Sequence, residues 1–310
     1  MRIAAVDLGT NTLLMTIADV VDTNLSVLCD MHSIVRLGEN VTTTGRISEA
    51  ALDRALEVLR SYASLCNDFR VDVRVGVATS AARRATNADD VLNSCSAVYG
   101  GSIHKISGEE EAELTYGGSV PNDADAVVLD IGGGSTEIVS GNRGRVRSKV
   151  SMEIGAVTLH EKFLRNEPVQ ANDIKDAREM IRSVLCDTPM VRGDWYGVAG
   201  TPTTLALMAQ NVEYTDVKAA HDYLLTHETV REISHMLLVR TTSEIRALRG
   251  VHPQRADILS AGALILDEVM HFHNCAALRV STRGLRYGVL LQAVDAVGKR
   301  TNVTKDTNLS

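Results

Sequence analysis

One short pattern occurs twice in this chain of 310 residues, at positions 123 residues apart. An apolar run ends in Asp-x-Gly and leads through a tight turn into a second apolar run, first at Val6–Thr12 and again at Leu129–Ser135. Short apolar runs bounded by glycine-rich turns are typical of buried β-strands. Similarity at one fixed offset therefore predicts two related α/β lobes.

The rest of the chain alternates between helix and strand patterns, as such lobes require. Residues 71–77 alternate apolar and polar side chains, which predicts a strand, and Ser48 is typical of the cap of a helix. One helix is expected over residues 80–98, and others over 170–185 and 255–270. The polar, turn-rich residues 121–125 suggest a boundary between a lobe of residues 1–122 and one of residues 123–310.

Composition excludes several classes of protein. A hydrophobic fraction of 45% and a charged fraction of 23% are globular values. No run approaches the roughly 18 apolar residues of a membrane helix, and no membrane partner is expected. The five cysteines are scattered without a C-x-x-C pair, so we expect a reduced, cytoplasmic protein without a structural zinc site. A net charge of -7 with 4% aromatic residues disfavours DNA as a partner.

Both Asp-x-Gly turns are suited to holding phosphate. Glycine lets the backbone approach a ligand closely, and consecutive turn amides can point at one anion. The second turn is the stronger case, because Gly132–Gly134 are followed by the hydroxyl residues Ser135 and Thr136. An Asp at the end of the preceding strand can hold Mg²⁺. A plain glycine-rich hairpin is the alternative for each turn, since no Walker or G-x-G-x-x-G motif is present.

Three charged segments have both a functional and a structural interpretation. The acidic run Glu109–Glu113 either complements a helix dipole or turns one Glu into the cleft as a general base. Arg83 and Arg84 follow a strand, where they either clamp phosphate or face solvent. Basic side chains alternate over residues 143–149, which would attract a polyanion or protect a strand edge from aggregation.

Taken together in their order, these motifs resemble those of the exopolyphosphatase / guanosine pentaphosphate phosphatase (Ppx/GppA) family. They cover nearly the whole chain: Asp7–Thr12, Arg36–Gly38, Thr79–Asn87, Ser107–Ala112, Asp130–Glu137, Gly200–Thr201, Arg255–Asp257 and Arg283–Gly288. The resemblance implies an α/β fold of two duplicated actin-like, sugar-kinase-like (ribonuclease H-like) lobes with a cleft between them. It also implies that a last helix, over about residues 286–298, packs back on the first lobe.

The resemblance further implies a role for each matching residue. Glu111 matches the catalytic Glu that activates the attacking water. Asp130 and Glu137 match carboxylates that bind Mg²⁺ or position the water, and Asp7 matches a more variable metal position. The phosphate-binding positions are Gly9, Thr10, Asn11, Arg83, Gly132, Gly133, Gly134 and Ser135. Gly200, Thr201 and Arg286 are further candidates for substrate contact, and a monovalent cation such as K⁺ is a second candidate cofactor.

The activity implied is Mg²⁺-dependent hydrolysis of a terminal phosphoanhydride. The substrate would be polyphosphate or a guanosine polyphosphate, and the length matches the short, two-domain form of the family, for which a homodimer is expected. Longer members carry extra helical domains that line a polyphosphate channel. Two alternatives remain open: a kinase of the same fold, and a non-catalytic sensor that binds guanosine tetra- or pentaphosphate.

Overall fold

The first lobe is built on a sheet of five strands. The computed structural model describes residues 1–21, 24–121, 124–167 and 169–294. In the sheet order β3-β2-β1-β4-β5, the first three strands are antiparallel neighbours and the last two run parallel to β1. The strands are β1 (Arg2–Leu8), β2 (Thr12–Val21), β3 (Asn24–Ile34), β4 (Val73–Ala78) and β5 (Ser102–Lys105).

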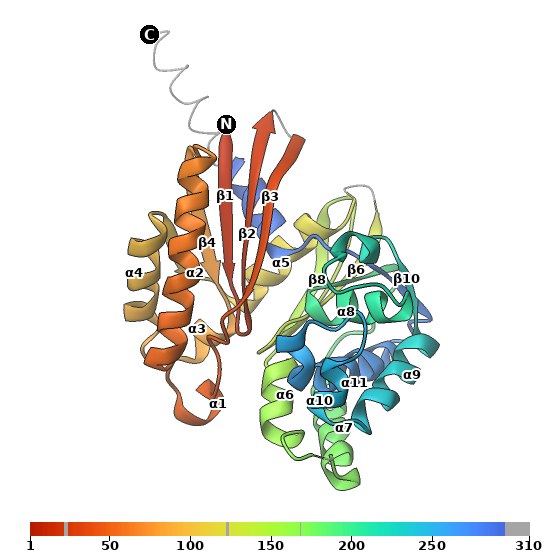
Figure 1. Cartoon of the computed structure of the whole chain (residues 1–310). Helices are drawn as coiled ribbons and strands as arrows, with labels where there is room; N and C mark the ends of the chain where they lie inside the picture. Colours follow the sequence, from red (N-terminus) through yellow and green to blue (C-terminus); the bar gives the residue numbers. More distant parts are fainter. Residues whose placement is uncertain (22–23, 122–123, 168, 295–310) are drawn as a thin grey trace, which may run out of the picture.

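Helices cover both faces of this sheet (Figure 1). On one face, α2 buries Leu59 and Tyr62 and α4 buries Val91 and Cys95 in the same core cluster as the strands. On the other face, residues 285–294 form a helix whose Leu285 and Leu290 pack against the strands. The helices of the first half are α1 (Val41–Thr44), α2 (Glu49–Asp68), α3 (Ser80–Arg84), α4 (Ala88–Tyr99) and α5 (Gly108–Ser119).

The second lobe repeats the strand order of the first. Its sheet runs β10-β11-β9-β6-β7-β8, so β6 pairs antiparallel with β7 and parallel with β9, as β1 does with β2 and β4. The strands are β6 (Asp125–Ile131), β7 (Thr136–Asn142), β8 (Arg145–Met152), β9 (Asp194–Val198), β10 (Leu224–Thr226) and β11 (Ala277–Val280). The expected duplication of two α/β lobes is therefore confirmed.

The helices of the second lobe pack around the long apolar helix α11, and nearly all residues of α11 are buried. They are α6 (Ala156–Phe163), α7 (Ala171–Leu185), α8 (Gly200–Ala209), α9 (His227–Leu238), α10 (Thr242–Arg246) and α11 (Ala256–Phe272), with 3-10 turns η1 (Val217–Ala220) and η2 (Pro253–Arg255). In the described part of the chain, no helix is both long enough and apolar enough to cross a membrane.

The single helix expected over residues 80–98 is wrong, because the chain breaks between α3 and α4. Ala85 is extended, with φ −85° and ψ 130°. The side chain of Asn87 accepts a hydrogen bond from the Ile47 amide at 3.0 Å and donates one to the Ile47 carbonyl at 2.9 Å. These contacts with a distant segment outweigh local helix propensity. The break leaves Arg83 in a short helix beside the cleft.

Two other expectations reach beyond the described residues. The boundary placed between residues 122 and 123 lies outside them, and so do residues 295–298 of the last helix. Within the described part, the chain returns from β11 to the first lobe, and its last helix lies beside the red strands in Figure 1.

Candidate active site

The cleft between the lobes holds a cavity of about 400 Å³. Most of the residues predicted from sequence line it: Asp7, Gly9, Thr10, Asn11, Glu111, Asp130, Gly132, Gly133, Gly134, Ser135, Gly200, Thr201 and Arg286. Arg83 and Glu137 are not in the lining, but both contact residues that are: Arg83 binds Glu111 and Ser135, and Glu137 is hydrogen-bonded to Ser135. Residues 123 positions apart in the sequence thus face one another across one space.

The glycine loop after β6 has its carbonyls tied to the start of α6. The amides of Ala156 and Val157 donate to the carbonyls of Gly132 and Gly133 at 2.9 and 2.8 Å. The amides of Gly133 and Gly134 have no hydrogen-bond acceptor among the described residues. Because the carbonyls are already bound on the α6 side, the amides remain available to an anion in the cleft.

The loop after β1 is held in the same way by another segment. The amide of Gly38 donates to the Thr10 carbonyl at 2.8 Å, and the amides of Val35 and Arg36 both donate to the Asn11 carbonyl at 3.0 Å. The turn at residues 35–38 therefore supports the first loop as the start of α6 supports the second. This backing explains why the motif Arg36–Gly38 accompanies Asp7–Thr12.

The two loops also touch each other across the cleft. A Cβ added at Gly134 would lie 2.5 Å from Ser80 Oγ and 2.7 Å from Thr10 Oγ1, and one added at Gly133 would lie 3.1 Å from Thr10 Cβ. At Gly134 a Cβ would force Ser80 and Thr10 to move, and at Gly133 it would make an unusually tight contact, so glycine at both positions lets the lobes approach this closely. The glycines thus allow the two lobes to come into contact, and they also leave the backbone amides accessible from the cleft.

Four carboxylates gather below the loops. Burial, with the charges of Glu111 and Asp130 adding to it, raises the pKa of Asp7 to about 8. Burial likewise raises the pKa of Asp130 to about 7 and that of Glu137 well above its usual value. Asp7 Oδ1 and Glu137 Oε2 are buried without a hydrogen-bond partner among the described residues. Burying several carboxylates together is unfavourable unless a cation neutralises them.

This donor set fits Mg²⁺, which prefers carboxylate oxygens. The side chains are not gathered tightly around one point, since no group of three or more His, Cys, Asp or Glu in the described ranges could by itself hold a metal ion. Magnesium usually keeps several waters and takes one or two carboxylates, so a tight cage is not needed. Asp7, Asp130 and Glu137 are the candidate ligands, of which one or two would bind the ion directly and the rest through its waters.

Arg83 links the predicted base to the second phosphate loop. Its Nη1 donates to Glu111 Oε2 at 2.5 Å, and its Nη2 donates to Ser135 Oγ at 3.3 Å and to Glu153 Oε1 at 3.4 Å. Glu111 is nearly buried, which raises its pKa, while the Arg83 guanidinium opposes that shift. The ion pair brings the two predicted residues together, and it places a cation next to the anion loop.

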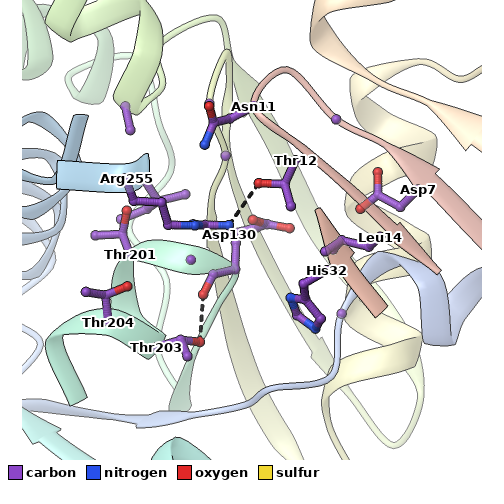
Figure 2. A pocket seen from close by; sticks show the side chains of 18 of the residues that line it. Asp7, Asn11, Thr12, Leu14, His32, Asp130, Thr201, Thr203, Thr204 and Arg255 are labelled. Atoms are coloured by element: carbon purple, nitrogen blue, oxygen red, sulfur yellow. Dashed lines mark hydrogen bonds between the residues drawn. The ribbon is translucent and has the colours of Figure 1, made fainter. Parts of the chain in front are cut away.

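Arg255 lines the cavity, although no role for it was predicted from the sequence. It is held between the lobes, and Figure 2 shows it reaching toward Thr12, to whose Oγ1 its Nη2 donates at 2.8 Å. A Cβ at Gly200 would lie 1.3 Å from Arg255 Nη1, so only glycine leaves room for it. The motif Arg255–Asp257 was the one signal of this residue in the sequence.

Arg286 is fixed by the first lobe. Its Nε donates to Thr16 Oγ1 at 2.8 Å and to Asp30 Oδ1 at 3.0 Å, and its Nη2 donates to Asp30 Oδ2 at 2.8 Å. The side chain is 4% exposed. It therefore joins the returning C-terminal segment to β2 and β3 at the cavity wall.

Two of the four basic residues in the stripe over residues 143–149 form ion pairs with acidic side chains. Lys149 Nζ lies 2.7 Å from Glu113 and 3.3 Å from Glu109, and Arg147 Nη1 lies 3.7 Å from Asp125. These pairs attach an edge strand to α5 and its acidic first turns. These pairs favour a structural role for the basic stripe and for Glu109 and Glu113, over a role in binding a polyanion or in catalysis.

Comparison with known proteins places the chain in a family. The model of the Ppx/GppA phosphatase family matches residues 16–297. The chain belongs to this family. It is a hydrolase of the Ppx/GppA type, and its two sheets form two duplicated α/β lobes.

Relatives in the Ppx/GppA family match nearly the whole chain. Exopolyphosphatase 2 of Mycobacterium tuberculosis is 37% identical over 288 residues, which cover 86% of this chain and 89% of that protein. The crystal structure of the Aquifex aeolicus Ppx/GppA family member has a TM-score of 0.80 and 32% identity, and covers 95% of this chain and 97% of its own. An exopolyphosphatase structure from Cytophaga hutchinsonii has a TM-score of 0.85 and 29% identity, and covers 96% and 98%.

Proposed function

We propose that the protein is an exopolyphosphatase that releases the terminal phosphate of inorganic polyphosphate. The observation that carries the proposal is the pair of facing anion loops with a buried carboxylate group below them. The relative of 37% identity from Mycobacterium tuberculosis, named exopolyphosphatase, supports the same substrate.

In this proposal the two loops bind and orient the terminal phosphoryl group. Free amides at Gly133 and Gly134 donate to its oxygens, and the hydroxyls of Thr10 and Ser135 lie on either side. Arg83, next to Ser135, adds a guanidinium suited to phosphate. Such preorganised donors lower the barrier by positioning and electrostatic stabilisation.

Glu111 takes the proton of the attacking water. Glu111 lines the cavity, and burial keeps its carboxylate basic, because burial raises its pKa. The water oxygen forms a bond to the terminal phosphorus, the bond from that phosphorus to the bridging oxygen breaks, and a chain shorter by one phosphate leaves. Mg²⁺ held by Asp7, Asp130 and Glu137 would neutralise the charge on the phosphoryl oxygens.

The variant Glu111→Gln tests this assignment. Removing a general base lowers the rate by roughly 10²–10⁴-fold. Phosphate release would be measured with Mg²⁺ on polyphosphates of graded chain length, on guanosine pentaphosphate and on ATP. Glu109→Gln, an exposed residue of the same acidic run, is the matched control. Near-wild-type release by Glu111→Gln would contradict the proposal, and ADP formation only with an added acceptor would indicate a kinase.

A guanosine polyphosphate is the second candidate substrate, since part of the cavity wall is apolar. Leu14, Leu207 and Tyr214 line the cavity together with His32, whose pKa burial lowers to about 4. A phosphate chain alone gains nothing from such a wall, whereas a nucleoside packs against one. Tight guanosine polyphosphate binding without turnover, unchanged in Glu111→Gln, would instead indicate a sensor.

A further inference from the structure

Two sequence motifs have no part in the proposed chemistry, and they meet across the cleft. Arg36 lies in the turn that supports the first phosphate loop, and Asp257 lies in the first turn of α11 in the second lobe. Arg36 Nη1 donates to Asp257 Oδ2 at 2.7 Å, and its Nη2 donates to the Gln254 carbonyl at 2.9 Å. The residues are 221 positions apart in the sequence.

A second arginine, Arg255, lies close to Asp257 in the sequence and reaches from the second lobe to the first. Arg255 Nη2 donates to Thr12 Oγ1 at 2.8 Å. Arg255 has no carboxylate within ion-pair distance among the described residues, and burial lowers its pKa to about 10. Residues 254–257 thus bind the first lobe on both sides of the loop that holds Thr10 and Asn11.

A further contact between the lobes lies beside the pair of Arg36 and Asp257, at a second cavity lined by these two residues and by the residues of the contact. The Asn40 amide donates to Glu161 Oε1 at 2.8 Å, and Arg165 Nη2 donates to Asn40 Oδ1 at 3.0 Å. Glu161 and Arg165 belong to α6 and the residues after it, and the amides at the start of α6 bind the second phosphate loop. The crossing at Arg36 therefore starts from the turn that supports the first phosphate loop, and the crossing at Asn40 ends on α6, which supports the second.

We propose that Arg36 and Asp257 are positioning residues, which form a reversible latch that holds the two lobes, and with them the two phosphate loops, in register around the terminal phosphate. The pair is partly exposed, at 36% for Arg36 and 22% for Asp257. Exposed ion pairs contribute little net stability, so the latch can open for substrate entry and product release. The kinetic part of this inference rests on the proposed function, whereas the closed geometry does not.

The test compares Asp257→Asn with the charge-swapped double variant Arg36→Asp/Asp257→Arg. Asp tolerates the left-handed backbone at position 36, where φ is 50°, better than Arg does. Asp257→Asn should increase the radius of gyration measured by small-angle X-ray scattering without substrate. It should also lower kcat about fivefold and raise KM for polyphosphate, and the double variant should restore all three values.

The matched control is Asp19→Asn, which breaks the Arg2–Asp19 pair of 2.8 Å within the first lobe. It should leave scattering and kinetics at wild-type values. Wild-type scattering and kinetics in Asp257→Asn would overturn the proposal. So would a folded double variant that keeps the increased radius of gyration and the lowered kcat. Scattering needs no substrate, so it tests the latch independently of the proposed function. An increased radius in Asp257→Asn, together with no phosphate release from polyphosphate by the wild-type protein, would refute the function and leave the latch standing.

Discussion

Asp7 and Asp130 occupy equivalent places in the two lobes, each at the end of a central strand and before a phosphate loop. Both are half-buried, and both have raised pKa values for the same reason: removal of the carboxylate from solvent, with neighbouring carboxylates adding to it. A carboxylate in this state is unfavourable to the fold when it is charged and unpaired. Asp7 and Asp130 are therefore suited to binding a cation, and without a cation their charged forms lower the free energy of unfolding.

This predicts how the stability of the metal-free protein depends on pH. The folded pKa of Asp7 is about 8, against an ordinary value of 3.8. Between these values the folded state keeps a proton that the unfolded state has lost, so the free energy of unfolding falls as the pH rises. The melting temperature of EDTA-treated protein, followed by circular dichroism, should therefore fall from pH 5 to pH 8.

Added Mg²⁺ should raise the melting temperature more at pH 8 than at pH 5, because the carboxylates bind it in the charged form. In Asp7→Asn the fall with pH should be smaller. An equal Mg²⁺ effect at both pH values would show that these carboxylates are not the cation site.

At the scale of the element, the junction between β9 and α8 stores backbone strain beside the cavity. Ala199 has φ 69° and ψ −166°, a conformation that glycine adopts far more readily. It lies in the cavity wall next to Gly200, and its carbonyl accepts a hydrogen bond from Thr203 Oγ1 at 2.8 Å (Figure 2). The tight turn is what brings the start of α8 to the cleft.

Ala199→Gly should consequently stabilise the protein by about 1 kcal/mol, because relief of the strain exceeds the entropic cost of glycine. The midpoint of urea unfolding measures this. Ala206→Gly, inside α8, is the control and should destabilise by about 1 kcal/mol. Equal destabilisation by both substitutions would mean that position 199 carries no strain.

At the scale of the whole molecule, the last described helix packs on the lobe that contains the first strand. Leu285, Val289 and Leu290 pack against the first sheet, and Arg286 binds Thr16 and Asp30. This return joins the lobes on one side of the cleft, whereas Arg36 and Asp257 join them on another. The expected homodimer and cytoplasmic location stay predictions from the sequence.

Arg286→Ala should lower the free energy of unfolding by about 1.5–3 kcal/mol, the range for hydrogen bonds to charged groups. Urea unfolding would measure the change. Arg283→Ala is the control, because Arg283 is exposed and stacks only on Tyr287 at 5.8 Å among its described contacts. Its effect should stay within about 0.5 kcal/mol, and a similar small effect for Arg286→Ala would show that the return segment is not held by this residue.

The sequence alone determined the duplicated α/β lobes and the two glycine loops, and it singled out Glu111 as a candidate site residue. Local hydrophobic patterns and matching motifs are sufficient to recognise each of these features. Only the tertiary structure decided that Arg83 pairs with Glu111, that Arg286 binds Asp30, and that Arg36 crosses to Asp257. It also decided the break between α3 and α4. The physical reason is the same in each case: a side chain's partner depends on which distant segment folding brings beside it, and local periodicity does not contain that information.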